Sequence, residues 1–261
     1  MGEVLLKVEN VEIRFGGIIA LQGVSFEARR GDITAVIGPN GAGKTTMFNC
    51  ITGMYRPSAG RILFQDQDVT RMSAFRIAQR GIARTFQNLA LFQDLTVFEN
   101  LKMGAYRHGG TGLLEGAILS PRARREEAEV ERRALETLEF LGISAVAEKK
   151  PTALSYGVQK RVEFARALMQ NASLILLDEP MAGMNQGEKT DLVQLILSIR
   201  DRLGVSFLLV EHDMPVVMGL SDHIIVLNFG RKIAEGLPEE IRKDEEVIAA
   251  YLGSDGADQA A

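Results

Sequence analysis

A glycine-rich loop between an apolar run and a helical segment constrains this chain more than any other feature. Residues 38–46 read Gly-Pro-Asn-Gly-Ala-Gly-Lys-Thr-Thr and satisfy every fixed position of the phosphate-binding pattern G-x-x-x-x-G-K-[ST]. The apolar residues 33–37 come directly before the loop and predict the buried strand that feeds it. This order of strand, loop and helix predicts a nucleotide site in an α/β fold.

Each residue type in the loop has a chemical reason to be there. Glycines let the backbone wrap closely around a polyphosphate and present N–H donors to it. Lys44 adds a positive charge at the outer phosphates, Thr45 can offer its hydroxyl to Mg²⁺, and the helix that begins near Lys44 directs its positive end at the anion. The predicted phosphate-binding residues are Gly38, Pro39, Asn40, Gly41, Ala42, Gly43, Lys44, Thr45 and Thr46.

Length and composition describe a globular protein. The 261 residues, 46% of them hydrophobic, can bury the core of one or two domains. A formal net charge of −4 argues against broad nucleic-acid binding, which requires clustered Lys and Arg. The one cysteine, Cys50, cannot form an internal disulfide and is typical of a reducing compartment. Apolar runs such as 207–210 are too short to span a bilayer, so a role at a membrane would need other chains to hold the protein there.

The first half of the chain begins with β patterns and continues with helical ones. Alternating residues in 5–26 predict short strands and turns, and residues 61–69 predict another β element. Residues 97–105 and a long segment from Pro121 carry apolar positions at helical spacing. Residues 89–165 therefore resemble a helical insert in an α/β core.

The second half returns to α/β patterns without any internal repeat. Short apolar runs predict buried strands, and an amphipathic stretch predicts a helix between them. The expected elements are strands at 174–177 and 205–210, helices at 189–202 and 239–252, and a β pair over 224–234.

Acidic and histidine side chains follow two of these predicted strands. Asp178 and Glu179 end the first, where a parallel sheet presents ligands, so that Asp178 can hold the Mg²⁺ water shell and Glu179 can polarise an attacking water. His212 follows the second and either contacts the γ-phosphate and orients the catalytic carboxylate or is an ordinary core histidine.

Two other residues have alternative interpretations. Phe15, just before Gly16 and Gly17, either stacks on a base or packs in the core. Gln87 closes the segment before the helical insert, and its amide either coordinates Mg²⁺ or water and reports the nucleotide state to that insert, or has no such role.

The order of these motifs resembles the ATP-binding cassette superfamily over essentially the whole chain. The resemblance rests on the phosphate loop, Gln87, residues 154–159, residues 174–179 and His212. Residues 154–159 read Leu-Ser-Tyr-Gly-Val-Gln and correspond to that family's signature, Leu-Ser-Gly-Gly-Gln. In that family two cassettes close head to tail, and the signature of one contacts the γ-phosphate held by the other. Ser155 would begin a helix, whose N-terminal N–H groups favour an anion.

The resemblance implies a fold and its boundaries. The fold class is α/β, a P-loop NTPase (RecA-like) core with an N-terminal antiparallel β subdomain and an inserted α-helical subdomain. A single ATPase domain would span residues 1–253, with the core at 1–88 and 166–253, the helical signature subdomain at 89–165 and a flexible tail at 254–261.

The resemblance also implies roles, with ATP and Mg²⁺ as cofactors. Phe15 would stack on adenine, and Ser155 and Gly157 would join the loop residues in binding ATP. Thr45, Gln87 and Asp178 would contact the metal. Glu179 would be the general base, His212 the switch histidine and Gln87 the sensor of Mg²⁺ and water.

Three positions depart from the superfamily pattern. Tyr156 replaces the first glycine of the signature, Val158 replaces its glutamine, and Asn185 stands where an aspartate is usual. Tyr156 and Asn185 resemble the first of the two ATPase subunits of importers for branched-chain and other hydrophobic amino acids, as do residues 81–88, the Gly-rich 104–121 and the ending 249–253. Val158 does not fit that subfamily, which implies that the two composite sites of a heterodimer are unequal.

The resulting prediction is an ATP-hydrolysing subunit of a membrane importer, at the cytoplasmic face of the inner membrane. Its partners would be a second ATPase subunit, in a heterodimer or a homodimer, two permease subunits, and an extracytoplasmic binding protein, with no nucleic acid. The apolar residues Leu89, Leu91, Phe92 and Leu95 would be part of the permease docking surface or of the core.

Three alternatives remain at this point. The substrate could instead be an amide, urea or an aromatic acid. A non-transport ATPase of the same fold, acting on DNA or the ribosome, is less favoured, because the segment between Lys44 and Ser155 is too short for a long coiled coil and the chain has one cassette. A small-molecule kinase would have no use for a signature or a switch histidine.

Overall fold

The computed structural model describes residues 2–85, 90–105 and 121–255. The chain forms two compact units, one comprising Met1–Ile77 with Ser173–Ala261 and the other Ala78–Ala172. The second unit therefore extends beyond the predicted insert, 89–165, at both ends.

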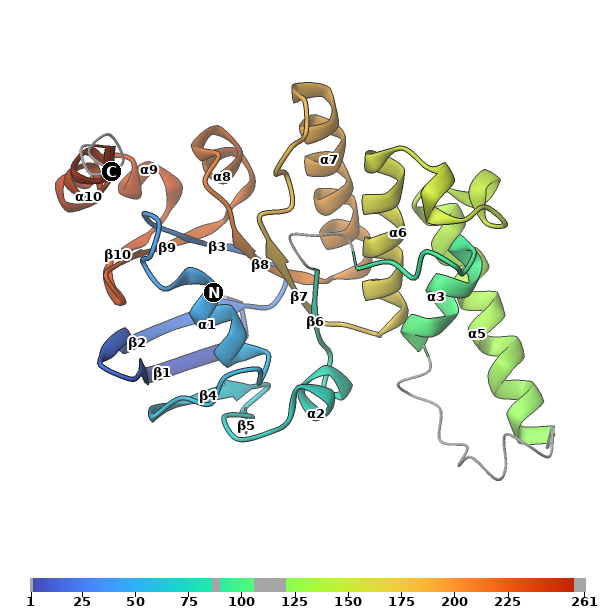
Figure 1. Ribbon diagram of the computed structural model, residues 1–261, viewed down its shortest axis with the longest axis horizontal. Coiled ribbons are helices and arrows are strands. Elements are labelled where there is room, and N and C mark those ends of the chain that lie inside the picture. The colour runs from blue at the N-terminus through green and yellow to red at the C-terminus, as the bar shows by residue number, and fades with distance from the viewer. Residues whose placement is uncertain (1, 86–89, 106–120, 256–261) are drawn as a thin grey trace. The chain divides into compact units, whose positions relative to one another are not determined.

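An antiparallel sheet opens the first unit, with strand order β2-β1-β4-β5 (Figure 1). Strands β1 (Val4–Phe15) and β2 (Ile18–Arg29) form a hairpin, and β4 (Ala59–Phe64) and β5 (Gln67–Asp68) extend the sheet. The prediction of strands and a turn at Gly16 and Gly17 is confirmed, but the expected shortness of the strands is wrong, because both are 12 residues long. Register shifts near Asn10, whose φ is 49°, let the ladder continue past the irregular positions.

A second sheet forms the core of this unit and contributes the strands that position the site. Its strands from this unit follow the order β10-β9-β3-β8-β7. Strands β9 (His223–Asn228), β3, β8 and β7 run parallel, and β10 (Arg231–Gly236) pairs antiparallel with β9. Every residue of β3 (Ile33–Ile37), β7 (Leu174–Asp178) and β8 (Ser206–Val210) is buried, which explains their nearly continuous apolar sequences.

The parallel strands end at one edge of the sheet, where helices begin. Figure 1 shows α1 (Lys44–Ile51) between the two sheets, and α7 (Gln186–Leu203) and α8 (Met214–Leu220) on the other side of the core sheet. The loop after β3, the residues after β7 and those after β8 therefore meet at the carboxyl edge, as in other open α/β sheets.

The C-terminal segment contains two helices where one was predicted over 239–252. They are α9 (Pro238–Ile241) and α10 (Glu245–Asp255). The prediction missed the break because Asp244 begins a new helix, its carboxylate accepting hydrogen bonds from the N–H groups of Glu246, at 2.9 Å, and Val247, at 3.1 Å. Helix α10 includes the first two residues of the predicted tail, and residues 256–261 lie outside the described part.

The second unit is mainly helical. Helix α2 (Ala74–Gln79) leads into it, followed by β6 (Ile82–Arg84), α3 (Val97–Ala105), α5 (Pro121–Phe140), the 3₁₀ turns Ser144–Val146 and Pro151–Ala153, and α6 (Tyr156–Met169). Helix α3 packs on α5 and α6, and Gly104 allows the close approach, since a Cβ there would lie 2.5 Å from the Arg166 carbonyl oxygen. In the described part of the chain, no helix has both the length and the apolar character needed to cross a membrane.

Candidate active site

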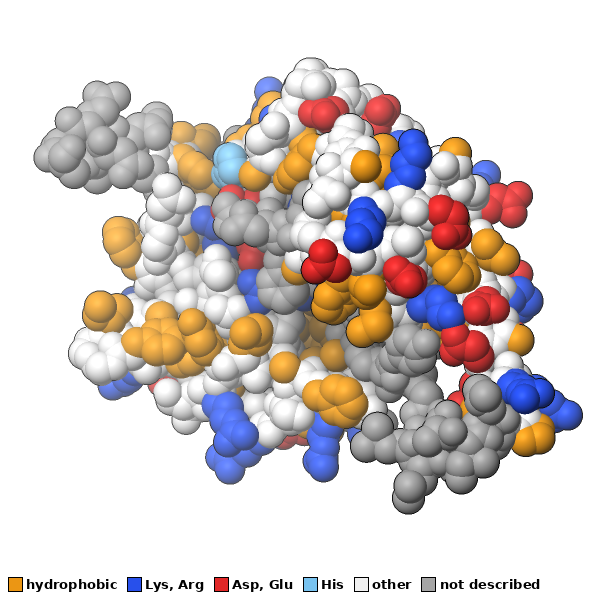
Figure 2. Space-filling model, turned by 45° about the vertical axis from the view of Figure 1, so that its right-hand side comes forward, with side chains coloured by type: hydrophobic (Ala, Val, Ile, Leu, Met, Phe, Trp, Pro, Cys, Tyr) orange, Lys and Arg blue, Asp and Glu red, His pale blue; other side chains and the backbone are white. Residues whose placement is uncertain are grey.

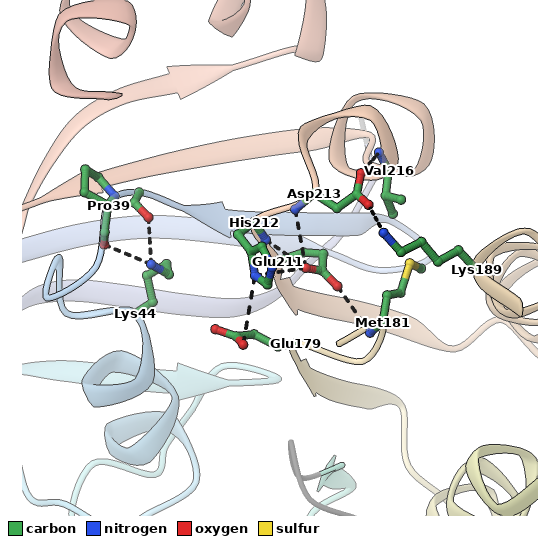
Figure 3. Close-up of polar contacts among 10 residues, drawn as sticks. Pro39, Lys44, Glu179, Met181, Lys189, Glu211, His212, Asp213 and Val216 are labelled. Carbon is green, nitrogen blue, oxygen red and sulfur yellow. Dashed lines mark hydrogen bonds and ion pairs between the residues drawn. The ribbon is translucent and has the colours of Figure 1, made fainter. Parts of the chain in front are cut away.

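The phosphate loop surrounds the Lys44 ammonium group. Lys44 Nζ donates hydrogen bonds to the carbonyl oxygens of Gly38, at 2.7 Å, and Pro39, at 3.0 Å (Figure 3). Burial lowers the pKa of Lys44, and the negative charges of Glu179 and Asp178 partly oppose that effect. The loop therefore holds a desolvated positive charge within the electrostatic reach of two carboxylates.

Backbone atoms of neighbouring segments lie so close to two glycines of the loop that no side chain would fit there. Gly38 has φ 147°, and a Cβ there would lie 2.0 Å from the carbonyl oxygen of Leu227. Gly43 has φ 102°, and its Cβ would lie 2.8 Å from the Ala20 carbonyl oxygen. By contrast, a Cβ on Gly41 would meet open space. The loop is closed on the protein side and open at Gly41, which fits a cradle for phosphate oxygens.

The ends of β7 and β8 bring the predicted carboxylates and histidine together. Asp178 is 7% exposed at the end of β7. Glu179 follows with φ 45°, an unusual conformation for a non-glycine residue, and its N–H donates to the Val210 carbonyl at 2.8 Å. His212 Nδ1 lies 3.9 Å from Glu179 Oε2, and Figure 3 shows the two side chains pointing toward each other. Backbone strain of this kind clusters at functional sites.

Glu211 organises the segment that carries the histidine, although sequence reasoning did not select it. Its side chain is 1% exposed and accepts hydrogen bonds from the N–H groups of His212, at 2.8 Å, and Met181, at 3.2 Å. A signal was available, because Glu211 follows an apolar strand just as Asp178 ends one.

Asp213 extends this polar network to two helices. Its carboxylate caps α8 by accepting the Val216 N–H at 3.3 Å and pairs with Lys189 of α7. The hydrogen bond from Lys189 is the main reason that the pKa of Asp213 lies below its ordinary value.

Aromatic side chains lie exposed at the end of the first hairpin. Phe15 is 44% exposed, which argues against the core alternative, and its ring centroid is 5.1 Å from that of Tyr55 in an edge-on arrangement. Sequence reasoning missed Tyr55, which has no motif of its own. Figure 2 shows hydrophobic side chains over this sheet, and the exposed ones of β1, β2 and the turn after α1 are Phe15, Ile18, Ile19, Met54 and Tyr55.

The signature residues belong to the second unit and face outward from it. Ser155 is exposed at the start of α6, and its side chain caps no N–H of that helix. A Cβ on Gly157 would meet open space. Lys160 supports Tyr156 with its ammonium 5.8 Å from the ring centroid. The first turn of α6 therefore presents N–H groups at an open surface, where an anion is favoured.

Other predicted residues are only partly described. Gln87 and Leu89 lie outside the described residues, so their roles stay predictions. Leu91 is buried, whereas Phe92 is 47% exposed with the Arg166 guanidinium 5.6 Å from its ring centroid.

Asn185 has a clear structural role despite departing from the superfamily pattern. It begins α7 in a capping box with Glu188, with reciprocal hydrogen bonds of 3.0 Å. An aspartate could make the same cap, so the replacement preserves the start of the helix.

The donors around the loop also fit Mg²⁺. Thr45 is exposed and follows Lys44 at the start of α1, and Asp178 supplies one carboxylate from the end of β7. Mg²⁺ prefers such oxygen donors and commonly completes its shell with substrate phosphates and water.

Two family models match the sequence. One, described as "ABC transporter", matches residues 21–182. The other, described as "Branched-chain amino acid ATP-binding cassette transporter", matches residues 231–257.

Curated relatives are similar over nearly the full chain. A high-affinity branched-chain amino acid transport ATP-binding protein, BraF, of Pseudomonas aeruginosa is 42% identical and covers 97% of this chain and 99% of its own. The Escherichia coli protein of the same description, LivG, is 43% identical with the same coverage.

Solved structures are similar as well. A cassette of an ABC transporter in its ADP conformation superposes with a TM-score of 0.83, at 36% identity, over 96% of this chain and 99% of that one. A nucleotide-free cassette gives 0.82, at 35% identity, over 95% and 98%.

Proposed function

This chain belongs to the ABC transporter family of ATP-binding cassettes, and from that premise we propose that it is the ATP-hydrolysing subunit of an importer for branched-chain amino acids. The observation that carries the proposal is the similarity over 97% of the chain to relatives named for that transport. The separate match of residues 231–257 to a model of the branched-chain amino acid transporters supports the choice of substrate class.

Binding of ATP is proposed to use two parts of the first unit, the aromatic pair at Phe15 and the phosphate loop. Phe15, with Tyr55 against its edge, offers an exposed aromatic surface for adenine. The loop supplies backbone N–H groups, and the desolvated Lys44 ammonium attracts the outer phosphates more strongly than a solvated one would.

Hydrolysis is proposed to rest on Glu179. Its carboxylate accepts a proton from water as the water oxygen bonds to the γ-phosphorus and the bond to the ADP oxygen breaks. His212, 3.9 Å from that carboxylate, positions it. Thr45, Asp178 and Gln87 would hold Mg²⁺, which supplies charge neutralisation at the phosphates. The products are ADP, inorganic phosphate and a proton.

The site is proposed to need a second cassette. Ser155 and Gly157 face outward and would bind the γ-phosphate held by the loop of a partner, while the partner's signature would complete the site at Lys44. Val158 makes this signature differ from the family pattern, so a heterodimer with unequal sites is favoured. Two permease subunits would hold the pair at the cytoplasmic face of the inner membrane, and an extracytoplasmic binding protein would deliver the amino acid.

Transport in liposomes tests this function. The chain is purified with the permease and ATPase subunits with which it associates, enclosed with ATP, and supplied outside with the cognate binding protein. Labelled leucine, isoleucine or valine is expected to accumulate, and Lys44→Ala is expected to abolish it. Uptake of urea, amides or aromatic acids without branched-chain amino acids would contradict the substrate, and ribosome or DNA association without permeases would contradict transport.

A further inference from the structure

Four arginines surround a hollow beside strands β4 and β5. This arginine hollow has a volume of about 720 Å³ and is lined by one stretch of sequence, 56–76, which belongs to the first unit. The charged residues that line it are Arg56, Arg61, Asp68, Arg71 and Arg76, and all of them are exposed. The chain as a whole carries a formal net charge of −4, so this surface has the opposite sign to the protein that carries it.

Contacts within the first unit hold the segments that form the arginine hollow. The Thr70 hydroxyl accepts the Ile62 N–H at 2.9 Å and so joins the segment after β5 to β4. Gly53, with φ 72°, lets the turn after α1 approach the segment before α2, since a Cβ there would lie 2.9 Å from the Met72 carbonyl oxygen. The backbone around the hollow is therefore formed before any ligand binds, which reduces the entropy lost on binding.

Three of the four arginines keep their charge available for a ligand. Arg61 pairs with Glu9, with 2.7 Å between the nitrogen and the oxygen. Among the residues that the structure describes, no hydrogen bond or ion pair engages the side chains of Arg56, Arg71 and Arg76. A guanidinium group can donate two parallel hydrogen bonds to a phosphate, and several such groups around one hollow suit a group with more than one anionic oxygen. The chemistry of the hollow therefore favours a phosphate group.

The aspartate in the hollow offsets only part of this positive charge. Asp68 Oδ1 accepts hydrogen bonds from the Thr70 hydroxyl, at 2.5 Å, and from the Thr70 N–H, at 2.9 Å. These bonds are the main reason that the pKa of Asp68 lies below its ordinary value, and the positive charges of Arg61 and Arg71 lower it further. One carboxylate, already held by Thr70, faces four guanidinium groups, so the hollow remains positive.

Exposed apolar side chains adjoin the arginine hollow in sequence. Phe75 stands between the lining residues Ser73 and Arg76 and is 60% exposed. Met54, two residues before Arg56, is exposed as well. Apolar side chains interspersed with arginines are typical of surfaces that bind anionic membranes, where the cations contact the headgroups and the apolar groups enter the interface. A free phosphate in water would have no use for them.

We propose that the arginine hollow binds the phosphate of an anionic phospholipid headgroup. The inference rests on the proposed function, because the permease subunits would hold this chain beside a membrane leaflet that contains anionic lipids. The site is separate from the phosphate loop, none of whose residues, all of them described, lines the hollow. Contact with lipid would add an electrostatic attachment to the one that the permeases supply.

Binding of the full chain to vesicles tests the inference. The chain is mixed with vesicles of equal parts phosphatidylglycerol and phosphatidylcholine, or of phosphatidylcholine alone, and the bound fraction is measured by sedimentation. The wild type is expected to bind the anionic vesicles only, despite its own net negative charge, and to bind them less as salt is added.

Two matched double variants assign the binding to the hollow. Arg71→Gln/Arg76→Gln is expected to lower the partition coefficient about ten- to thirtyfold, because each arginine near an anionic surface contributes about fivefold. Arg124→Gln/Arg125→Gln removes the same charge from exposed positions of α5 and should stay within about twofold of the wild type, since distant surface charges are screened. Thermal unfolding verifies that both variants fold.

Several results would overturn the inference. Wild type that binds neither kind of vesicle, or both equally, would exclude recognition of anionic lipid, and equal losses in the two double variants would exclude the hollow as its site. If Arg71→Gln/Arg76→Gln bound vesicles normally but lost either its permeases on purification or affinity for inorganic pyrophosphate, the hollow would belong to a permease segment or to a free anion instead. A chain that binds anionic vesicles through these arginines but supports no amino-acid uptake would contradict only the proposed function.

Discussion

The phosphate loop and the signature turn are both proposed to bind phosphate, and the structure builds them in opposite ways. The loop is closed in by its own unit, with Gly38 against the Leu227 carbonyl and Lys44 bonded to loop carbonyls. The signature turn is open, with Ser155 exposed and free space around Gly157. One segment has its supporting contacts within the unit that carries it, whereas the other presents its N–H groups outward. This difference is what a site shared between two cassettes requires.

The largest expected effect concerns the chemistry at the loop. Glu179→Gln removes the proposed base while keeping the side chain's size, so ATP turnover is expected to fall about 10²- to 10⁴-fold. Binding of MgATP should persist, because the loop is unchanged. Turnover and Kd measured on the assembled transporter check both points. Undiminished hydrolysis would remove Glu179 from the role of base.

The second largest effect is expected from a buried ion pair in α6, the helix that begins in the signature. Lys160 and Glu163 form an ion pair of 3.1 Å, with side chains 1% and 2% exposed. Lys160→Met removes the positive charge that pairs with the buried Glu163 carboxylate, and it is expected to destabilise the protein by about 3–5 kcal/mol. Denaturant unfolding measures the loss. Arg132→Met, which breaks exposed pairs on α5, is the control and should change stability little.

A matched pair of glycine substitutions compares the two segments directly. Gly38→Ala places a methyl group 2.0 Å from the Leu227 oxygen in a backbone conformation that alanine disfavours, at a cost of about 1–3 kcal/mol and with weaker ATP binding. Gly157→Ala meets open space, and in a helix alanine is favoured by about 0.5–1 kcal/mol. Thermal unfolding and nucleotide titration of both variants check this contrast. Equal losses of stability in Gly38→Ala and Gly157→Ala would contradict the contrast between a closed loop and an open signature turn.

The smallest expected effect is a pH dependence of stability at Asp213, the residue after His212. The folded-state pKa of Asp213 is depressed, so its contribution to stability is present above the ordinary value of 3.8 and is lost as pH falls through the lowered folded value. Asp213→Asn should therefore be less stable than wild type above about pH 4, with a difference that shrinks at lower pH. Unfolding free energies measured from pH 3 to 7 test this, and a difference independent of pH would contradict it.

Sequence patterns predicted the strands that are buried on both faces, a helix with one packed face, and the loop whose motif lies in consecutive residues. The strands at 33–37 and 174–177 are buried on both faces and therefore appear as apolar runs. Helix 97–105 matches its predicted bounds because one face packs and the other is solvated. The phosphate loop was evident because its chemistry resides in nine consecutive residues.

Features that depend on distant contacts were not predictable in this way. Tyr251 and Tyr55 gain their places only when the fold packs α10 against β3 and β9 and brings the turn after α1 to Phe15. The break before α10 depends on the Asp244 cap, a short polar signal within an apolar helical pattern. Glu211 is a different case, since its position after a buried strand was visible and was passed over.

Dilution of the isolated chain tests the shared site most directly. The chain is loaded with MgATP, and the single-turnover rate of hydrolysis per bound ATP is followed over a range of chain concentrations, alone and with added second cassette. We expect bound ATP to be retained while its hydrolysis falls toward zero on dilution and returns when the second cassette is added, and we expect Ser155→Ala to lower the returned rate. A rate per bound ATP that stays constant down to concentrations at which the chain is monomeric would contradict it.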